Sequence, residues 1–381
     1  SVGRAALGIE PGDILTPQEL RADLTRVVGY GGFEGVEFRV DREPDGDRLE
    51  VRPTDKRHGP IFLRPALSLT DQQRGTGAWS LRSYIDWTRI NSRGAEAWAE
   101  IEVGTRHGFA ALANVPVDAA ERVFVSAGGS LGRREVVPEI TGVPISLDLT
   151  DREAFLGLGV RFGWFGDLTV GVGAAHNTLE SPPDLPDADD EVWDERSLDA
   201  RLDIDVLDRV VFPSSGVRLQ VDYTRADSVA GGNIAFEQLR IEAMGVASVG
   251  PITGTLSLLT SSGLGSEVPF YRAVTLGGIE RMTGLERDAI WGGYAGVAKV
   301  GLNYRFGADA RATGDGLRLG VSGEAGQAQP TSTGWRWPPD DLLIGGSIWL
   351  GLGTPLGPIT VAFADVEGRK AGWVFQIGAV R

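Results

Sequence analysis

Residues 198–206 read LDARLDIDV, and the order of these residues decides the fold. Apolar residues occupy the even positions, while aspartate and arginine occupy the odd positions. Because successive side chains of a β-strand point to opposite faces, this order produces one apolar face and one charged face. The same alternation recurs at residues 79–87, 217–223 and 298–305. The repetition predicts a protein built largely from two-faced strands.

Two-faced strands occur in soluble sandwiches and in membrane barrels, and two observations favour a barrel. The polar face carries charges on strand after strand, which suits a wet lumen crossed by ion pairs. Large aromatic residues also lie toward the ends of the strands, where membrane barrels place their aromatic girdles. These residues are Trp79, Trp87, Tyr223, Tyr304, Trp349 and Trp373.

Counting the alternating stretches gives sixteen strands, an even number as expected for a bacterial outer-membrane barrel. We expect them near residues 60–71, 76–90, 95–105, 107–115, 122–137, 151–164, 166–179, 194–207, 215–226, 233–248, 251–263, 294–307, 314–327, 341–353, 356–366 and 370–380. The tight connections follow even-numbered strands. The longest connections follow odd-numbered strands, at residues 138–150, 180–194, 264–293 and 328–340. This asymmetry predicts a 16-stranded antiparallel transmembrane β-barrel over residues 60–381, with short periplasmic turns and long outer loops.

Residues 1–59 have a different pattern. Thr16 and Glu19 form a capping box, so a helix is expected to begin at Pro17. Apolar residues then alternate with polar ones over residues 36–40 and 49–51. We predict one small α+β domain here, too small for an enzyme and suited to an interaction or spacer role.

Composition excludes several classes of protein. The 381 residues contain no run of 18 apolar residues, so no membrane-spanning helix is encoded. The net charge of −15 argues against a nucleic-acid partner, because phosphate binding requires clustered Lys and Arg. The chain has no cysteine, which removes disulfides, thiolate metal sites and cysteine nucleophiles. We expect no cofactor.

No catalytic residue is assigned. Residues 128–132 read GGSLG and match the Gly-x-Ser-x-Gly nucleophile motif, but that motif requires a strand, a sharp turn and a helix. Ser130 instead lies in the middle of an expected barrel strand. His58, His107 and His176 are too scattered to form a metal motif, and we expect them at the wall or rim.

An acidic stretch at residues 184–195 contains seven carboxylates. Asp187, Asp189 and Asp190 are weak candidates for a calcium site, or for divalent bridges to lipopolysaccharide. The spacing of an EF-hand is absent. We therefore expect a solvated outer loop with no bound metal.

Residues 264–293 are the longest expected loop, and their second half reads VTLGGIERMTGLERDAIWGG. If this loop folds inward, Arg281 and Arg287 arrive among acidic lumen side chains. Which carboxylate they would meet is open at this point. The alternative is an ordinary surface loop. Gly277 and Gly278 precede the tip, where their spacing favours a defined turn.

A family resemblance emerges from these features together. A small α+β domain, sixteen strands, and a loop with GGxxRxTGL followed by GGYAGVAKVGLNYRF resemble the POTRA-plus-barrel superfamily of bacterial outer-membrane assembly factors and surface antigens (BamA-like). The resemblance implies that residues 1–59 form a periplasmic POTRA domain. It also implies a tip arginine that reaches a carboxylate on the barrel wall, and Glu324 on the thirteenth strand stands at the position of that carboxylate. Whether Arg281 forms this contact is open. The tip here is Met282, Thr283, Gly284 and Leu285, so Thr283 stands at the arginine position.

Several short motifs are similar to one branch of this superfamily, the patatin-like phospholipases or type Vd autotransporters. They are the tip itself and residues 91–98 (NSRGAEAW), 115–118 (VPVD), 208–216 (DRVVFPSSG) and 322–326 (SGEAG). The motif at residues 208–216 places Asp208, Phe212, Pro213 and Gly216 in a periplasmic turn. The branch implies an outer-membrane translocator or anchor for an N-terminal patatin-type phospholipase outside this chain.

The expected partners are outer-membrane lipid and lipopolysaccharide, the protein's own N-terminal passenger, and the barrel-assembly machinery. This chain itself is not expected to be an enzyme, whereas the full-length protein would be a hydrolase. The alternative functions are an outer-membrane protein assembly factor or a two-partner-secretion transporter, and, less favoured, a passive porin.

Overall fold

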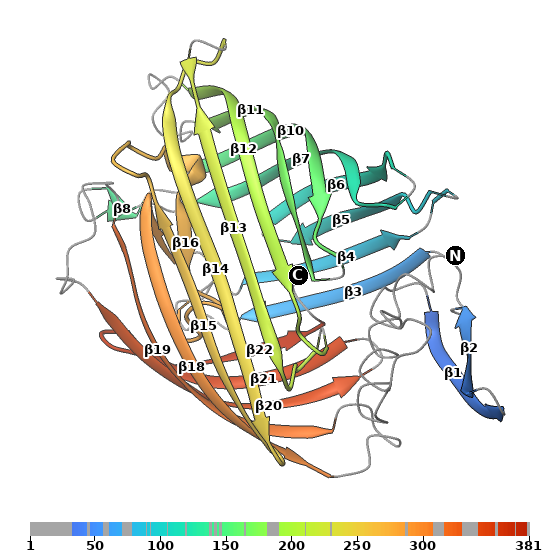
Figure 1. Cartoon of the computed structure of the whole chain (residues 1–381). Coiled ribbons are helices and arrows are strands. Elements are labelled where there is room, and N and C mark those ends of the chain that lie inside the picture. Colours follow the sequence, from blue (N-terminus) through green and yellow to red (C-terminus); the bar gives the residue numbers. More distant parts are fainter. Residues whose placement is uncertain are drawn as a thin grey trace.

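The dominant feature of the structure, a computed structural model, is a closed barrel of sixteen strands (Figure 1). The structure describes residues 33–43, 46–55, 61–70, 78–88, 90–91, 93–104, 106–118, 120–136, 139–140, 143–144, 147–163, 165–180, 190–209, 211–228, 231–285, 289–307, 316–329, 342–354, 357–369 and 371–378. The barrel strands are β3 (Ile61–Thr70), β4 (Ala78–Trp87), β5 (Glu96–Gly104), β6 (Arg106–Pro116), β7 (Val123–Val136), β10 (Leu147–Arg161), β11 (Gly166–Glu180), β12 (Glu191–Asp205), β13 (Gly216–Ala226), β14 (Phe236–Val249), β15 (Ile252–Ser262), β18 (Tyr294–Phe306), β19 (Leu317–Gln329), β20 (Leu343–Thr354), β21 (Gly357–Val366) and β22 (Gly372–Ile377).

The barrel strands follow one another in chain order, and each pair is antiparallel. The last strand, β22, pairs with the first, β3, and this pairing closes the ring. Each barrel strand corresponds to one of the sixteen stretches expected from the sequence. The predicted fold class is therefore confirmed for the barrel.

Alternation along each strand separates a lipid face from a lumen face. On β10 the residues Leu156 and Leu158 are exposed on the outside, and Val170 and Val172 on β11 are likewise exposed. Buried polar side chains point inward, among them Glu195 and Glu324. A hydrocarbon solvent outside and a polar lumen inside therefore account for the period of two in the sequence.

One aromatic residue departs from the expected girdle. Trp79, Trp87, Tyr304 and Trp373 are exposed on the outer face, as a girdle requires. Trp349 instead stacks on Phe212, with ring centroids 6.1 Å apart, and so contributes to the lumen. Its position in the alternation of β20 already assigns it to the inward face, because exposed Ile348 and Leu350 flank it.

The loop boundaries also differ from the expectation. The loop after β7 carries a small two-stranded hairpin, β8 (Glu139–Ile140) and β9 (Val143–Pro144). Strand β12 begins at Glu191, so Glu191, Asp194 and Glu195 belong to the barrel wall. The expectation of one solvated acidic loop over residues 184–195 is therefore wrong for these three residues, because β12 extends the alternation into the acidic stretch.

The N-terminal region contributes a separate two-stranded sheet, β1 (Phe33–Glu43) and β2 (Gly46–Asp55). In the register of this sheet, Phe38 is paired with Val51 and Val40 with Leu49 along the backbone. The helix expected from Pro17 lies outside the described residues, so the POTRA domain stays a prediction. No helix within the described ranges is long and apolar enough to cross a membrane.

Candidate functional site: the loop inside the barrel

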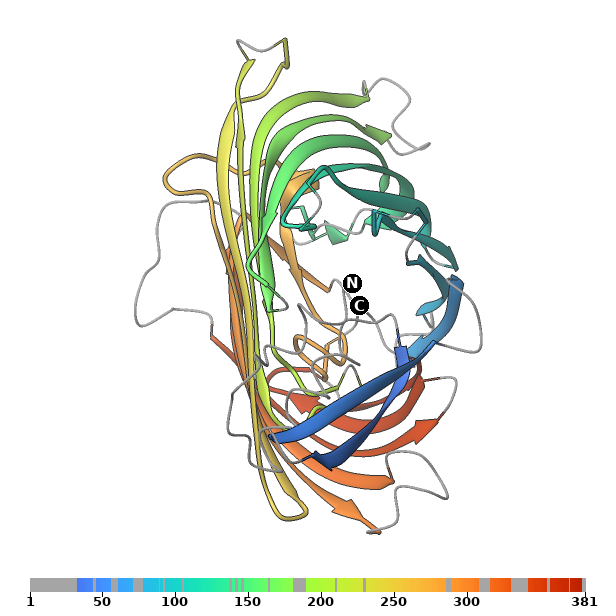
Figure 2. The same cartoon turned by 45° about the vertical axis from the view of Figure 1, so that its right-hand side comes forward.

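The chain between β15 and β18 folds into the barrel. It contains a 3-10 turn, η2 (Phe270–Arg272), and two short strands, β16 (Val274–Leu276) and β17 (Ile290–Gly292), which pair antiparallel. Figure 1 shows β16 behind the yellow strands of the wall, and Figure 2 shows part of this orange segment within the ring of strands. We call this segment, residues 263–293, the lumen loop.

Apolar contacts attach the lumen loop to several parts of the wall. Val274 and Leu276 pack with Leu259, Ala295 and Val297 of β15 and β18. Tyr271 packs with Leu149 and Trp193 of β10 and β12, and Met282 and Leu285 pack with Val366 of β21. Since these strands lie on different sides of the barrel, the loop extends across the lumen, and the surrounding wall buries its apolar side chains.

The tip of the lumen loop is a compact turn. Gly278 N–H donates to the carbonyl of Leu285 at 3.0 Å, and Met282 N–H donates to the carbonyl of Gly278 at 3.0 Å. Gly277 and Gly278 have φ of 130° and 85°, which residues with a side chain rarely adopt. The backbone conformation of the turn therefore requires glycine at both positions. At Gly284 a Cβ would lie 2.6 Å from Val366 Cγ2, so glycine allows the tip to touch β21.

Glu324 of β19 receives the tip. The Thr283 backbone N–H donates to Glu324 Oε2 at 2.5 Å, and the Thr283 hydroxyl donates to Oε1 at 2.5 Å. Lys299 Nζ of β18 lies 2.8 Å from the same carboxylate, and Ser322 Oγ donates to it at 3.1 Å. Glu324 and Thr283 are 3% and 1% exposed. A buried carboxylate is costly unless it is paired and hydrogen-bonded, and these donors meet that requirement.

The cation beside Glu324 comes from the wall and not from the tip. Lys299 Nζ also donates to Thr283 Oγ1 at 2.8 Å and to the carbonyl of Ile279 at 2.7 Å. Arg281 points elsewhere: it donates to the carbonyl of Thr275 at 2.8 Å and lies 3.7 Å from Glu242 of β14. Lys299 and Thr283 thus occupy the place that the family pattern gives to one arginine. Arg287 lies outside the described residues.

A second polar contact joins the lumen loop to the opposite arc of the wall. Arg272 lies 2.9 Å from both Glu195 of β12 and Glu153 of β10, and the Tyr271 hydroxyl donates to Glu195 at 2.9 Å. Glu195 is fully buried. Burial and the neighbouring Glu195 carboxylate raise the pKa of the Tyr271 hydroxyl, so it remains a donor.

Sequence reasoning missed this contact. The sequence places Glu195 both at the end of the acidic stretch and at the start of the expected strand 194–207, but it does not indicate a contact with the loop. Its inward position follows because it shares one face of the strand with Ser197, Asp199 and Arg201. Nothing in the residues around Arg272 identifies its partners, because they lie 77 and 119 positions away along the chain.

The predicted periplasmic turn joins β12 to β13 and is built around Asp208. Its carboxylate accepts hydrogen bonds from the backbone N–H groups of Ser214 at 2.7 Å and Ser215 at 3.1 Å, and from the Ser214 hydroxyl. Gly216 has φ of 115°, and a Cβ there would lie 2.2 Å from the carbonyl of Val206. The turn therefore depends on both its aspartate and its glycine.

The same turn inserts a ring into the mouth of the lumen. Phe212, followed by Pro213, has φ of 46° and stacks on Trp349 of β20. The guanidinium of Arg318, on β19, lies 5.1 Å from the Phe212 ring centroid and donates to its carbonyl at 3.3 Å. Arg318 is 1% exposed. The turn thus reaches across from β12 and β13 to β19 and β20.

The remaining candidates lie apart from the lumen loop. Ser130 lies within β7, and His107 and His176 lie on the outer face of β6 and β11. Asp187, Asp189 and His58 lie outside the described residues, whereas Asp190 directly precedes β12. Within the part of the chain that the structure describes, no three His, Asp or Glu side chains are close enough together to hold a metal ion.

The sequence comparison decides the family. A family model described as the Omp85 superfamily domain matches residues 121–379, which include the lumen loop and Glu324. The chain belongs to the Omp85 superfamily. The resemblance to BamA-like proteins is thereby confirmed at this level, and Omp85 barrels are outer-membrane translocators and assembly factors and not enzymes. A search of curated protein sequences finds no match.

Solved structures support the Omp85 fold. BamA from Haemophilus ducreyi lacking POTRA domains 1–3 has a TM-score of 0.64 at 16% identity, over 99% of this chain and 81% of that one. CdiB from Escherichia coli has a TM-score of 0.63 at 14% identity, over 98% of this chain and 72% of that one. CdiB from Acinetobacter baumannii has a TM-score of 0.61 at 12% identity, over 98% of this chain and 69% of that one. At these identities the likeness concerns the fold.

Proposed function

We propose that this Omp85 barrel translocates a polypeptide, and that the lumen loop closes its lumen at rest. The observation that carries the proposal is the attachment of the loop tip to Glu324. A passive porin needs an open lumen, whereas Met282, Thr283 and Leu285 are buried against the wall. A lumen closed by hydrogen bonds and a small apolar contact suits a passage that opens on demand.

The closure of the barrel provides a second supporting observation. Strand β22 pairs with β3 only from Leu67 opposite Ile377 to Thr70 opposite Val374. On its other edge β3 pairs with β4 along its whole length, from Ile61 to Thr70. Within the described residues, most of this edge of β3 is therefore not paired with β22. An unpaired strand edge accepts another extended chain, so we propose this seam as the place where polypeptide engages.

We further propose that the polypeptide is a patatin-type phospholipase attached N-terminally through a POTRA domain at residues 1–59. The proposal rests on the resemblance at residues 91–98, 208–216 and 322–326 and on Thr283 at the loop tip. A coding sequence upstream of Ser1 that encodes a lipase with Gly-x-Ser-x-Gly would agree with this passenger. Repeated POTRA domains there would instead favour an assembly factor or a two-partner-secretion transporter.

A disulfide across the seam tests the proposed translocation. The chain has no cysteine, so Leu69→Cys with Phe375→Cys introduces one register pair between β3 and β22. We expect the oxidised variant to stay folded but to lose most surface display of the polypeptide encoded upstream, measured by protease accessibility in whole cells. Reduction should restore display. The matched control is Leu202→Cys with Val221→Cys across β12 and β13.

The same cells separate the alternatives. Loss of folded outer-membrane porins, with display unchanged, would favour an assembly factor. No effect on either readout would contradict a role of the seam in polypeptide transport.

A further inference from the structure

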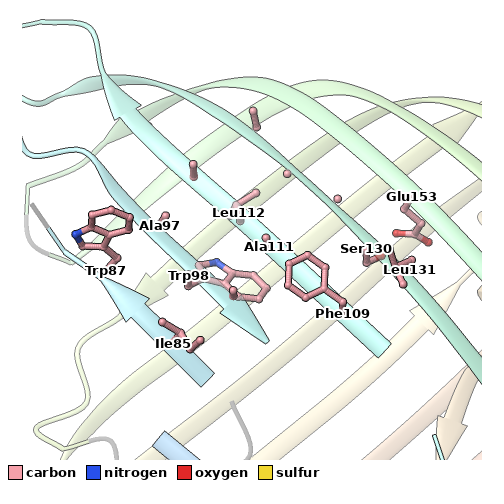
Figure 3. Close-up of a pocket in the computed structure, with 15 residues that line it drawn as sticks. Ile85, Trp87, Ala97, Trp98, Phe109, Ala111, Leu112, Ser130, Leu131 and Glu153 are labelled. Carbon is pink, nitrogen blue, oxygen red and sulfur yellow. The ribbon is translucent and has the colours of Figure 1, made fainter. Parts of the chain in front are cut away.

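The outer face of the barrel carries two adjoining hollows, of which the upper one lies toward the long loops. The lower one has a volume of about 510 Å³ and extends in Figure 3 between Trp87 and Leu131. The upper one has a volume of about 620 Å³ and is formed by β5, β6, β7, β10 and β11. Phe109 and Leu131 line both hollows, so the two are continuous.

The lower hollow is apolar because small residues face each other across the strands. Ala99 of β5 faces Ala111 of β6, and Ala111 faces Gly129 of β7. The next row toward the loops is large: Phe109 faces Leu131. A row of small side chains below a row of large ones leaves a groove at the level of the lipid chains.

The upper hollow is lined by four basic side chains and by the carboxylates of Glu102, Asp151 and Glu180. His107 of β6 faces Arg133 of β7, and Arg152 of β10 faces His176 of β11. All four side chains are exposed, and they share the outward face with Leu131, which lies opposite Arg152. Side chains that face each other across antiparallel strands have Cβ atoms about 5 Å apart, so the four groups form one patch at the edge of the apolar band.

One of the two arginines has no counter-ion among the described residues. Arg133 lies 2.9 Å from Asp148 and 2.9 Å from Glu180, and His176 lies 2.9 Å from Asp194. Arg152 forms no such ion pair within the described part of the chain. Arg152 is exposed beside Arg133 at the edge of the hydrocarbon layer. Two neighbouring guanidinium groups are suited to bind a phosphate group.

The patch is confined to one sector of the barrel. On β15, β18, β19 and β20 the outward positions carry no Lys, Arg or His; the cations of these strands, Lys299, Arg305 and Arg318, face the lumen. A general attraction to the membrane surface would place cations around the whole circumference. Within the described strands, basic residues at outward positions occur only from β6 to β13, and four of these six, His107, Arg133, Arg152 and His176, border the hollows. The hollows and these side chains therefore form one site.

We propose that these two hollows bind one phosphorylated glycolipid of the outer leaflet, lipopolysaccharide. Arg152 and Arg133 contact its phosphate, with His107 and His176 beside them, and an acyl chain lies in the groove over Ala111. This inference goes beyond polypeptide transport and rests on the outer-membrane location of the family. It also rests on the predicted orientation, in which the long loops face outward.

Binding of a defined lipid tests the site. The detergent-purified chain is titrated with bisphosphorylated lipid A, and bound lipid is counted by native mass spectrometry. We expect saturable binding of one lipid A, and Arg152→Glu weakens it by about tenfold or more, because an attraction to phosphate becomes a repulsion. The matched control is Arg225→Glu, an exposed arginine on the outer face of β13 that lies outside both hollows and pairs with Glu237. It should bind like the unaltered chain.

One further variant and two further lipids complete the test. Ala111→Leu fills the groove without changing charge and should weaken binding by about threefold or more; it serves as the test if Arg152→Glu does not assemble. Dephosphorylated lipid A and phosphatidylglycerol should bind at least tenfold more weakly than bisphosphorylated lipid A, in line with charge-assisted phosphate contacts. The proposal is overturned if Arg225→Glu weakens binding as much as Arg152→Glu, if neither Arg152→Glu nor Ala111→Leu weakens it, or if phosphatidylglycerol binds equally well.

Discussion

Glu324 is a buried carboxylate whose partners come from two directions. Thr283 approaches from the lumen loop through its N–H and its hydroxyl, while Lys299 approaches from the neighbouring strand. The wall supplies the charge, and the loop supplies only neutral donors. This division means that the loop can leave without separating an ion pair, because Lys299 remains beside Glu324.

Replacing Glu324 tests this contact. We expect Glu324→Gln to lower the free energy of unfolding by about 1–3 kcal/mol, since Lys299 loses its partner and Thr283 a charged acceptor. The temperature at which the barrel unfolds on semi-native gels should fall. The control is Asp222→Asn, which removes a lumen carboxylate paired with Arg201 of the adjacent strand. Equal shifts for the two variants would contradict a special role of Glu324.

At the scale of elements, the turn after β12 holds a charge that stabilises it. Partial burial would raise the pKa of Asp208, but hydrogen bonds from Ser214 and Ser215 outweigh this effect and keep the pKa below its ordinary value. A lowered folded-state pKa stabilises the turn above the unfolded-state pKa of about 4. That stabilisation is lost as the pH falls below this value through the folded-state pKa.

We therefore expect Asp208→Asn to unfold at a lower temperature than the unaltered chain at pH 7. The difference should shrink as the pH falls below about 4 through the folded-state pKa, because the carboxylate then becomes protonated in both states. Ser214→Ala is the matched variant, because it removes one of the donors and should show a smaller difference with the same dependence on pH. A difference that stays constant from pH 7 to pH 2 would exclude the charge as its source.

At the scale of the whole molecule, several polar contacts hold one loop against separate arcs of the barrel, and two of them are made to buried carboxylates. The tip binds Glu324 of β19, and Arg272 binds Glu195 of β12 and Glu153 of β10. Either contact alone keeps part of the loop in the lumen. Release of the loop therefore requires that both contacts break.

This arrangement predicts non-additive conductance. Arg272→Gln and Glu324→Gln should each raise single-channel conductance in planar bilayers only slightly, whereas the double variant should raise it by more than the sum of the two. Arg201→Gln combined with Asp222→Asn is the control for changes in lumen charge. Additive single effects would show that the two contacts act independently.

Much of the barrel follows from local sequence. The alternation along LDARLDIDV and its counterparts specifies which side chains face lipid, and the strand count and loop asymmetry follow from counting such stretches. The inward loop and Glu324 as its candidate partner also come from the sequence, through the family resemblance. Trp349 and Glu195 were assigned to the wrong surroundings, although the alternation of β20 and β12 places both of them inward.

The strands, their number and their two faces therefore follow from the order of residues alone, because a period of two is a local property that hydrocarbon and water select independently on each strand. Which groups meet inside the lumen depends on how the closed barrel folds. Lys299 and not Arg281 lies beside Glu324, Arg272 reaches Glu195, and Phe212 stacks on Trp349. These contacts join residues far apart in the chain, so they depend on how the closed barrel brings its walls and loops together.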